Sequence, residues 1–431
     1  MENTMSKLVF GTETIPGTPE PDTTRLYTNE AHTEWVDINY DEAKAGVAGR
    51  DFALEDPLSF ADGRRVESAA DWAERRRELL ALFEREVYGR MPPKPETAPF
   101  ALVAERERPE FGMVERRYRQ WFRADRTGPA IDWIVFLPLG AEKPCPAFMH
   151  LNYKGNDLIA TGNTSHFVLP LADMAARGFA FLSAHYIQIT SDGPERGGAP
   201  FNGVFELWVR GAEPANQDVL RGAEPATQDR EPDATGSLMA WAWGLCRGLD
   251  LAEAISEIDA SHCTVIGSSR LGKAALLAAA FDERFAGCVA NQTGAVGVQL
   301  MKRDYGENLA AQRLLFPWWY CPGVWKWAGR EREMPFDQHL LLACVAPRAL
   351  LLECYHKKWF DPRGEFLSAK AASPVWEFLT GKGLGLDEWP EPFDASFARP
   401  PFGYVRRTGT HGLSPDDWRW ALDFATEELA P

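Results

Sequence analysis

The chain has 431 residues, of which 45% are hydrophobic and 12% aromatic, so it carries enough apolar material for a large core. This composition excludes disorder over most of the length, because burial of apolar surface offsets the entropy of the chain. A formal charge of −16, without any run of Lys and Arg, argues against nucleic acid as a partner.

The cysteines and the apolar stretches bear on the compartment. Seven cysteines form no Cys-x-x-Cys pair, and we interpret them as buried small hydrophobic residues. No apolar stretch reaches the roughly 20 residues that span a membrane, so we expect no membrane partner. Residues 1–16 lack the long apolar segment of a signal peptide. The sequence leaves the compartment and the oligomeric state open.

The first half of the chain changes from a polar segment to a helix and then to strands. Residues 1–50 are polar, which predicts an arm packed on the core. Residues 69–88 show helical spacing of apolar side chains, and Gly89 ends that pattern. Strand patterns follow at 100–103, 113–122 and 131–139. The runs at 146–152 and 178–184 are continuously apolar, as in strands buried on both faces of a parallel sheet.

The second half alternates helices and strands. The predicted helices are 167–177, 237–258, 273–281 and 414–429, and the predicted strands are 262–266, 287–291 and 349–354. This order predicts an α/β fold with a doubly wound, mostly parallel sheet and helices on both faces. We expect one domain over 51–431 with a loop insertion at 199–236, where segment 210–218 recurs with one change as 221–229.

The most informative chemical pattern lies at 264–276. A β-branched run enters a turn that contains Gly267 and Gly272, and a helix rich in Ala and Leu follows at once. This is the setting of a nucleophile elbow, a strained strand-to-helix turn that exposes a serine hydroxyl. The helix N-terminus places partial positive charge where an oxyanion forms. Ser269 is therefore the predicted nucleophile, and an ordinary turn of small residues is the alternative.

A general base for this serine is expected far downstream, after the last strands. His411 lies in a polar, glycine-containing loop just before the final predicted helix and is our candidate. A surface histidine is the alternative. We expect His339 to be structural, and His150 and His185 to lie at strand ends beside the cleft. Neither a His-Glu-x-x-His pattern nor a Gly-x-Gly-x-x-Gly motif occurs, so we expect no metal and no cofactor.

These motifs resemble a known family. Gly267-Ser-Ser-Arg-Leu-Gly-Lys is similar to the Gly-Cys-Ser-Arg-x-Gly-Lys signature of glucuronoyl esterases, carbohydrate esterase family 15. Further blocks that resemble the family follow in order over nearly the whole chain. They include Asn39-Tyr-Asp-Glu-Ala, Asn152-Tyr-Lys-Gly-Asn, Asp304-Tyr-Gly-Glu, Phe316-Pro-Trp-Trp, Trp359-Phe-Asp-Pro-Arg-Gly-Glu-Phe and Arg407-Thr-Gly-Thr-His.

The resemblance implies an α/β-hydrolase fold and a serine esterase. The implied substrate is an ester of glucuronic acid, as in the 4-O-methylglucuronate links between xylan and lignin, cleaved through an acyl-enzyme intermediate. By the same resemblance, Ser269 attacks the carbonyl carbon, His411 takes the proton, and Arg270 helps to hold the oxyanion. The substrate-binding residues implied in this way are Lys273, Glu307, Trp319 and Gln299. Members of the family are often secreted.

The carboxylate that should assist His411 is missing from both places where the family has it. Gln292 occupies the first place and Lys357 the second. We predict that Asp361 is the acid, with Glu353 as an alternative. Two other interpretations stay open: Gln292 supports a slower enzyme, or the chain only binds uronate-bearing sugars. An acetyl or carboxylesterase acting on another carbohydrate ester is a further alternative.

Overall fold

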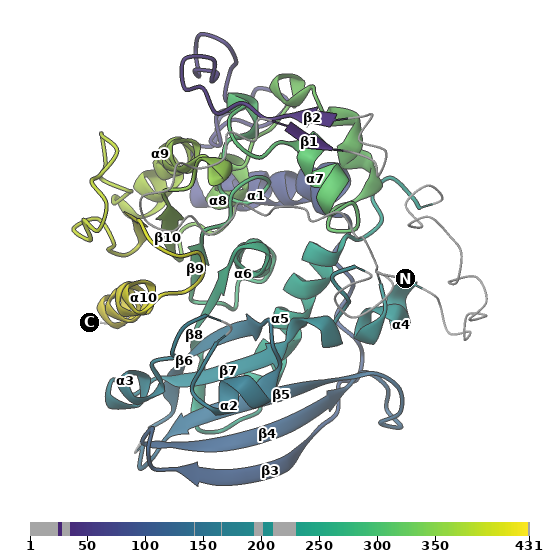
Figure 1. Cartoon of the computed structure of the whole chain (residues 1–431), viewed down its shortest axis with the longest axis vertical. Coiled ribbons are helices and arrows are strands. Elements are labelled where there is room, and N and C mark those ends of the chain that lie inside the picture. The colour runs from purple at the N-terminus through teal and green to yellow at the C-terminus, as the bar shows by residue number, and fades with distance from the viewer. Residues whose placement is uncertain are drawn as a thin grey trace, which may run out of the picture.

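The computed structural model describes residues 25–27, 35–141, 143–164, 166–193, 201–209 and 230–429. Within them, a nine-stranded sheet crosses the molecule in the order β11-β10-β9-β8-β6-β7-β5-β4-β3 (Figure 1). A separate antiparallel pair, β1 (Arg25–Tyr27) and β2 (Trp35–Asp37), precedes it in the chain. The large sheet carries helices on both faces, which is the predicted α/β-hydrolase architecture.

The sheet is antiparallel at one end and parallel elsewhere. Strands β3, β4 and β5 form an antiparallel meander, and β5 pairs antiparallel with β7. All remaining pairs, from β7 through β6, β8, β9 and β10 to β11, are parallel. The strands are β3 (Phe100–Arg108), β4 (Met113–Trp121), β5 (Ala130–Pro138), β6 (Cys145–Asn152), β7 (Ala180–His185), β8 (Ile258–Ser268), β9 (Gly287–Asn291), β10 (Ala349–Tyr355) and β11 (Phe402–Arg407).

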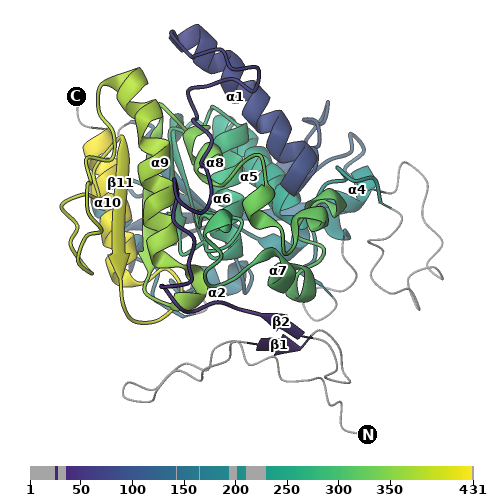
Figure 2. The same cartoon turned by 90° about the horizontal axis from the view of Figure 1, so that it is seen from above.

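Two apolar layers hold the helices against the sheet. Alternate side chains of one strand enter opposite layers, as Met149 and Phe148 of β6 do. One layer contains α1 (Ala69–Phe83), α5 (Ser237–Glu253), α6 (Arg270–Phe281), α8 (His339–Ala343) and α9 (Pro362–Thr380). These five helices are labelled in Figure 2. The other contains α2 (Asn156–Ala160), α3 (Leu171–Ala176) and α10 (Pro415–Glu428). Two short helices, α4 (Glu206–Val209) and α7 (Leu309–Leu315), complete the set.

Local sequence explains where the long helices begin and end. The Ser68 side chain accepts from Asp71 N at the start of α1, and a π-helical turn, Glu84–Tyr88, carries the helix on to Gly89 at a φ of 80°. At α10, Ser414 and Asp417 form a reciprocal capping box, which satisfies amide groups that have no partner within the helix. Both helices therefore start at side chains that supply the missing acceptors.

The predicted elements are confirmed, with shifted ends. The helix expected at 167–177 is shorter because Pro170 is its N-cap. Two of the longer elements that were not predicted are α9, which contains Pro374 in its interior, and β11, which ends in Arg406 and Arg407. An internal proline argues against a helix, although Asp361 as N-cap, Pro362 in the first turn and Gly381 as C-cap mark the ends of α9. Side chains of both elements are buried in the core.

The segment after β2 packs on the core next to residues 303–306. Asn39 Nδ2 donates to Asp304 O at 2.8 Å, and Gly46 N donates to Arg303 O at 2.6 Å. The predicted domain boundary at residue 50 stays a prediction. Residues 1–24 and the duplicated segment 210–229 lie outside the described residues.

All seven cysteines are buried and free, which confirms their interpretation as small hydrophobic residues. In the described ranges, no helix is both long and apolar enough to pass through a bilayer.

Trp418 provides a test of this packing. Its ring is fully buried and contacts the rings of Phe148 and Phe181 with centroids 5.9 and 6.0 Å apart. We expect Trp418→Ala to lower the free energy of unfolding by about 3–5 kcal/mol, measured by urea denaturation. The indole Nε1 has no hydrogen-bond partner among the described residues, so Trp418→Phe should cost clearly less. Equal losses in the two variants would contradict this packing role.

Candidate active site

Ser269 lies at the turn between β8 and α6 with a φ of 58° and a ψ of −129°. A left-handed φ is strained for any residue other than glycine, and strain of this kind is stored at functional sites. The Ser269 amide donates to Asn291 O at 2.9 Å, which ties the turn to the end of β9. The turn is tight, because a Cβ on Gly267 would lie 2.2 Å from Leu271 O. This is the geometry of the predicted nucleophile elbow.

Arg270, the first residue of α6, is fixed on several sides. Its guanidinium donates to Asp192 and lies over the rings of Trp319 and Phe316, at 4.8 and 5.3 Å from their centroids. Asp192 also accepts from Tyr186 Oη at 3.0 Å and from Trp319 Nε1 at 2.8 Å. A cation held this rigidly beside the nucleophile is a preorganised site for an oxyanion, in addition to the free amides of the first turn.

Asp192 is a functional residue that the sequence analysis missed. It lies in an irregular segment after β7, without periodicity or motif around it, and 78 positions separate it from Arg270. The only signal in the sequence was that Asp192 is the one charged residue in the segment 186–193.

Lys273, one turn along α6, and Glu307, from the loop before α7, form a buried pair of opposite charges. Lys273 is 3% exposed and its Nζ lies 5.1 Å from the centroid of Trp319. Burial lowers the pKa of Lys273 and raises the pKa of Glu307, and the attraction between the two charges opposes both shifts. Their predicted role in binding sugar hydroxyls stays a prediction, and the structure places both beside the cation of Arg270.

Gln299 and Trp319 support these charged residues. Gln299 Nε2 donates to Tyr305 O at 2.8 Å and to Glu307 O at 3.0 Å, which holds the loop that carries Glu307. Trp319 is 2% exposed and stacks on Phe316 with ring centroids 3.7 Å apart. Its ring also lies beside the cations of Arg270 and Lys273. Direct contact of Trp319 with a sugar stays a prediction.

The partner of His411 is Gln292. His411 Nδ1 lies 2.5 Å from Gln292 Oε1, and the same oxygen accepts from Gly412 N at 2.9 Å. An amide oxygen can only accept, so Nδ1 carries the proton and Nε2 presents its lone pair. Gln292 directly follows Asn291, whose carbonyl accepts from Ser269. Nucleophile and base are therefore both attached to the segment 291–292.

Among the described residues, no carboxylate oxygen is hydrogen-bonded to the imidazole. The pKa of His411 is lowered to about 3, first by burial and then by the positive charges of Lys357 and Arg270. The ring also packs on Phe360, with centroids 5.0 Å apart. Gln292 thus orients the base but does not stabilise its protonated form.

Asp361 is not the acid, and that prediction is corrected. Its carboxylate accepts from Gly364 N at 3.0 Å and from Arg303 Nε at 3.0 Å, at the N-terminus of α9. Burial raises its pKa to about 6, while Arg303 acts in the opposite direction. The carboxylate is thus engaged as a helix cap and ion-pair partner.

Glu353, the alternative acid, is turned toward β9. Glu353 Oε2 accepts from Asn291 Nδ2 at 3.0 Å. Burial, and next the charge of Asp417, raise its pKa well above the usual range. Glu353 is thus engaged with Asn291, and it is not the hydrogen-bond partner of His411.

The other histidines have different positions. His339 Nε2 lies 2.7 Å from Glu55 O inside the protein, which fits a structural residue. His150 is 4% exposed and packs on Phe181 and Trp418, so it does not line the cleft and that prediction is corrected. His185 is half-buried at the end of β7. Among the described residues, no three His, Cys, Asp or Glu side chains are grouped as metal ligands.

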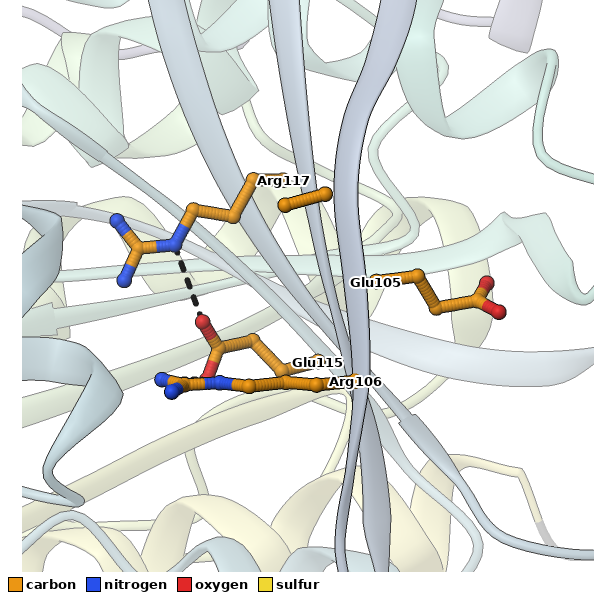
Figure 3. A pocket seen from close by; sticks show the side chains of 5 residues that line it. Glu105, Arg106, Glu115 and Arg117 are labelled. Carbon is orange, nitrogen blue, oxygen red and sulfur yellow. Dashed lines mark hydrogen bonds and ion pairs between the residues drawn. The ribbon is translucent and has the colours of Figure 1, made fainter.

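A hollow on the antiparallel end of the sheet is structural. It is lined by Arg106, Glu115 and Arg117 of β3 and β4, and in Figure 3 both arginines lie beside the carboxylate while Glu105 points away. Glu115 accepts from Arg106 Nε at 2.9 Å and from Arg117 Nε at 3.0 Å. Burial acts to raise the pKa of Glu115, but the guanidinium hydrogen bonds outweigh it and hold the pKa below its usual range. This cluster belongs to the sheet and not to the site around Ser269.

Comparison with known proteins identifies the family. A family model described as glucuronyl esterase, fungi, matches residues 230–380. Carbohydrate esterase MZ0003, from an unknown prokaryotic organism, is 31% identical over 100% of this chain and 99% of its own length. The chain belongs to the glucuronoyl esterases, carbohydrate esterase family 15.

Other glucuronoyl esterases are also similar to this chain, in structure and in sequence. The structure of the enzyme from Solibacter usitatus matches with a TM-score of 0.77 and 30% identity over 90% of this chain and 100% of that one. A promiscuous CE15 esterase from a marine bacterial metagenome gives a TM-score of 0.76 and 29% identity over 91% of this chain and 100% of that one. A 4-O-methyl-glucuronoyl methylesterase of Podospora anserina is 28% identical over 76% of this chain, and only 60% of its own length is covered.

The elbow generates a testable prediction. Gly267→Ala places a Cβ 2.2 Å from Leu271 O, and this contact is with backbone that cannot move without displacing Ser269. We expect esterase activity to fall by at least about 10²-fold, because small displacements of reacting groups have effects of this size. Ala274→Gly, further along α6, serves as a control for general destabilisation of the helix. Activity within threefold of the unchanged protein would contradict the strained turn.

The position of His411 predicts an unusual pH profile. A base with a pKa of about 3 stays neutral, and able to accept a proton, at all higher pH values. The ratio kcat/KM reports groups of the free enzyme, so its acidic limb should fall only as the pH drops toward about 3–4. The measurement is kcat/KM for an ester from about pH 3.5 to 8, with tryptophan fluorescence to follow folding. An acidic limb near the ordinary histidine pKa in folded protein would contradict this assignment.

Proposed function

We propose that this protein is a serine esterase that hydrolyses esters of the carboxyl group of glucuronic acid, including 4-O-methylglucuronate. The observation that carries the proposal is the arrangement around the elbow. Ser269 and His411 are attached to the same segment, and Arg270 lies beside them. Lys273 lies one turn further along α6, and the charge of Glu307, from the loop before α7, acts on it. Relatives named as glucuronoyl methylesterases support the same substrate class.

The proposed reaction uses only side chains of this chain. Ser269 Oγ attacks the ester carbonyl carbon and passes its proton to His411 Nε2, which is the ring nitrogen left free by Gln292. The oxyanion forms next to the N-terminus of α6 and the Arg270 guanidinium, where each preorganised donor typically contributes about 2.7–4 kcal/mol. The alcohol leaves with the proton from His411, and water then attacks the acyl-enzyme with His411 again as base.

Lys273 and Glu307 support a hydroxylated acid as substrate. Both side chains are buried and oppositely charged, so together they offer donors and acceptors in a region that excludes water. A site built to hydrogen-bond a hydroxyl discriminates strongly against analogues that lack it, because its polar groups are then left unpaired. An acetyl ester, which has no sugar on its acyl side, does not use this pair.

The neutral partner of His411 favours a second candidate function. Gln292 cannot stabilise an imidazolium, so a protein that binds glucuronate-bearing sugars without turnover is also consistent with the site. The fully formed elbow and the fixed Arg270 favour catalysis over this alternative.

The deciding assay uses benzyl and methyl esters of glucuronic acid, with acetyl esters as controls. We expect hydrolysis of the glucuronate esters, and a loss of at least about 10³-fold in kcat for Ser269→Ala, because the nucleophile is removed. Ser268→Ala, which removes the neighbouring hydroxyl, should keep most of the activity. Binding of glucuronate without turnover of any ester would favour the second candidate. Turnover of acetyl esters alone would indicate a different esterase.

Restoring a carboxylate provides a separate prediction. Gln292→Glu should raise kcat/KM by at least about tenfold, because a negative charge at 2.5 Å from His411 Nδ1 stabilises the imidazolium of the transition state. It should also move the acidic limb of the pH profile upward. Gln292→Ala, which removes both the charge and the orientation, should be slower than the unchanged protein. A slower Gln292→Glu enzyme would contradict the role given to this position.

A further inference from the structure

The loop that carries His411 wraps around one guanidinium. Arg407, the last residue of β11, donates from Nη1 to Thr408 O at 3.1 Å and to Thr410 O at 2.8 Å. Its Nη2 donates to Gly412 O at 2.6 Å. Three carbonyls that surround His411 in sequence are therefore fixed by a single side chain.

The guanidinium is itself fixed by Asp417. Arg407 Nε lies 2.8 Å from both carboxylate oxygens of Asp417, and Nη2 lies 2.7 Å from Oδ2. The side chains of Arg407 and Asp417 are 2% and 0% exposed. Asp417 also accepts from Ser414 N at 2.6 Å, so the pair is anchored to the start of α10. Four of the five donors of the guanidinium make these hydrogen bonds, and Nη2 is in addition in ion-pair contact with Asp417.

A short path leads from this pair to the imidazole. Gly412 accepts from Arg407 through its carbonyl oxygen, and its amide donates to Gln292 Oε1 at 2.9 Å. That oxygen is the one that orients His411 Nδ1 at 2.5 Å. The position of Gly412 therefore determines where Gln292 presents its only acceptor atom, and a shift of the loop moves the imidazole with it.

We propose that Arg407, held by Asp417, is the positioning residue of the catalytic base: its guanidinium shapes loop 408–412 so that His411 Nε2 faces Ser269. With a neutral amide at position 292, orientation is the only assistance that the base receives, and Arg407 supplies part of it. The inference rests on the proposed serine esterase activity for its kinetic readout, but not on the identity of the acyl group.

Two neighbouring arginines provide a matched pair of variants. Arg407→Lys keeps the charge but leaves three donors on a flexible stem, which cannot reach three carbonyls and a carboxylate together. Arg406 lies next to it on β11, packs over Trp389 at 4.0 Å and bonds to Pro390 O, away from the His411 loop. Arg406→Lys therefore controls for the loss of a guanidinium at the end of this strand.

The test measures hydrolysis of p-nitrophenyl acetate, an activated ester that does not depend on recognition of a sugar. We expect Arg407→Lys to lower kcat by about 10²-fold with KM within about twofold, because the base is displaced while the substrate pocket is unchanged. Arg406→Lys should stay within about twofold in both parameters. If Arg407→Lys does not fold, as judged by tryptophan fluorescence, Asp417→Asn replaces it with the same expected result.

A double-mutant cycle separates positioning from general damage. In a His411→Ala background the base is absent, so adding Arg407→Lys should change the residual rate by less than about twofold. A loss of the same factor with and without His411 would overturn the proposal, as would a kcat within threefold of the unchanged protein for Arg407→Lys alone.

The outcome is distinguishable from failure of the proposed function. If the protein hydrolyses p-nitrophenyl acetate but no glucuronate ester, the substrate proposal fails and the comparison of variants still stands. If it hydrolyses neither, the proton on His411 Nδ1 is followed by NMR. The proposal then expects a hydrogen-bonded resonance that Arg407→Lys weakens or removes, and an unchanged resonance would overturn it.

Discussion

The buried ion pair between Arg270 and Asp192 is the contact on which the arrangement of the site depends. Arg270 follows the nucleophile directly, so fixing its guanidinium also fixes the first turn of α6. Through Trp319, which donates to Asp192 and lies against both cations, the same contact reaches Lys273 and then Glu307. Breaking a buried pair by removing one partner leaves an uncompensated charge, so each member of this chain of contacts depends on the others. The polar cluster is stable only as a whole.

The electrostatics around His411 differ from those around Arg270. Of the carboxyl groups described near the base, Glu353 is hydrogen-bonded to Asn291 with its pKa raised by burial, and Asp417 is ion-paired with Arg407. The charges that act most on the pKa of the ring, those of Lys357, Arg270 and Arg407, are positive and lower it. The rigid contacts of the site therefore fix the donors for the oxyanion and the orientation of the base, and they do not stabilise the imidazolium.

Local patterns in the sequence were sufficient for the elbow and for most of the sheet. The turn around Ser269 needs small residues within a few positions, and the buried strands need apolar runs, so both leave a signal that a single segment contains. The same reasoning failed for Asp361, because its place near the end of β10 suggested proximity to His411, while a left-handed turn directs the carboxylate to Arg303 and α9. Asp192 was missed because only the folded chain brings it to Arg270. Contacts between distant segments cannot be read from the spacing of residues in either one.

The oxygen of Gln292 that His411 and Gly412 share determines the orientation and the tautomer of the base. A carboxylate has two equivalent acceptors and accepts a proton donor with either, whereas a primary amide has one acceptor end and one donor end. His411 Nδ1 and Gly412 N both point at the acceptor end, so rotating the amide by half a turn would bring donors against donors. Of the two rotamers of this side chain, one is therefore excluded. The imidazole is locked in a single tautomer, and this lock, unlike a charge, is insensitive to ionic strength.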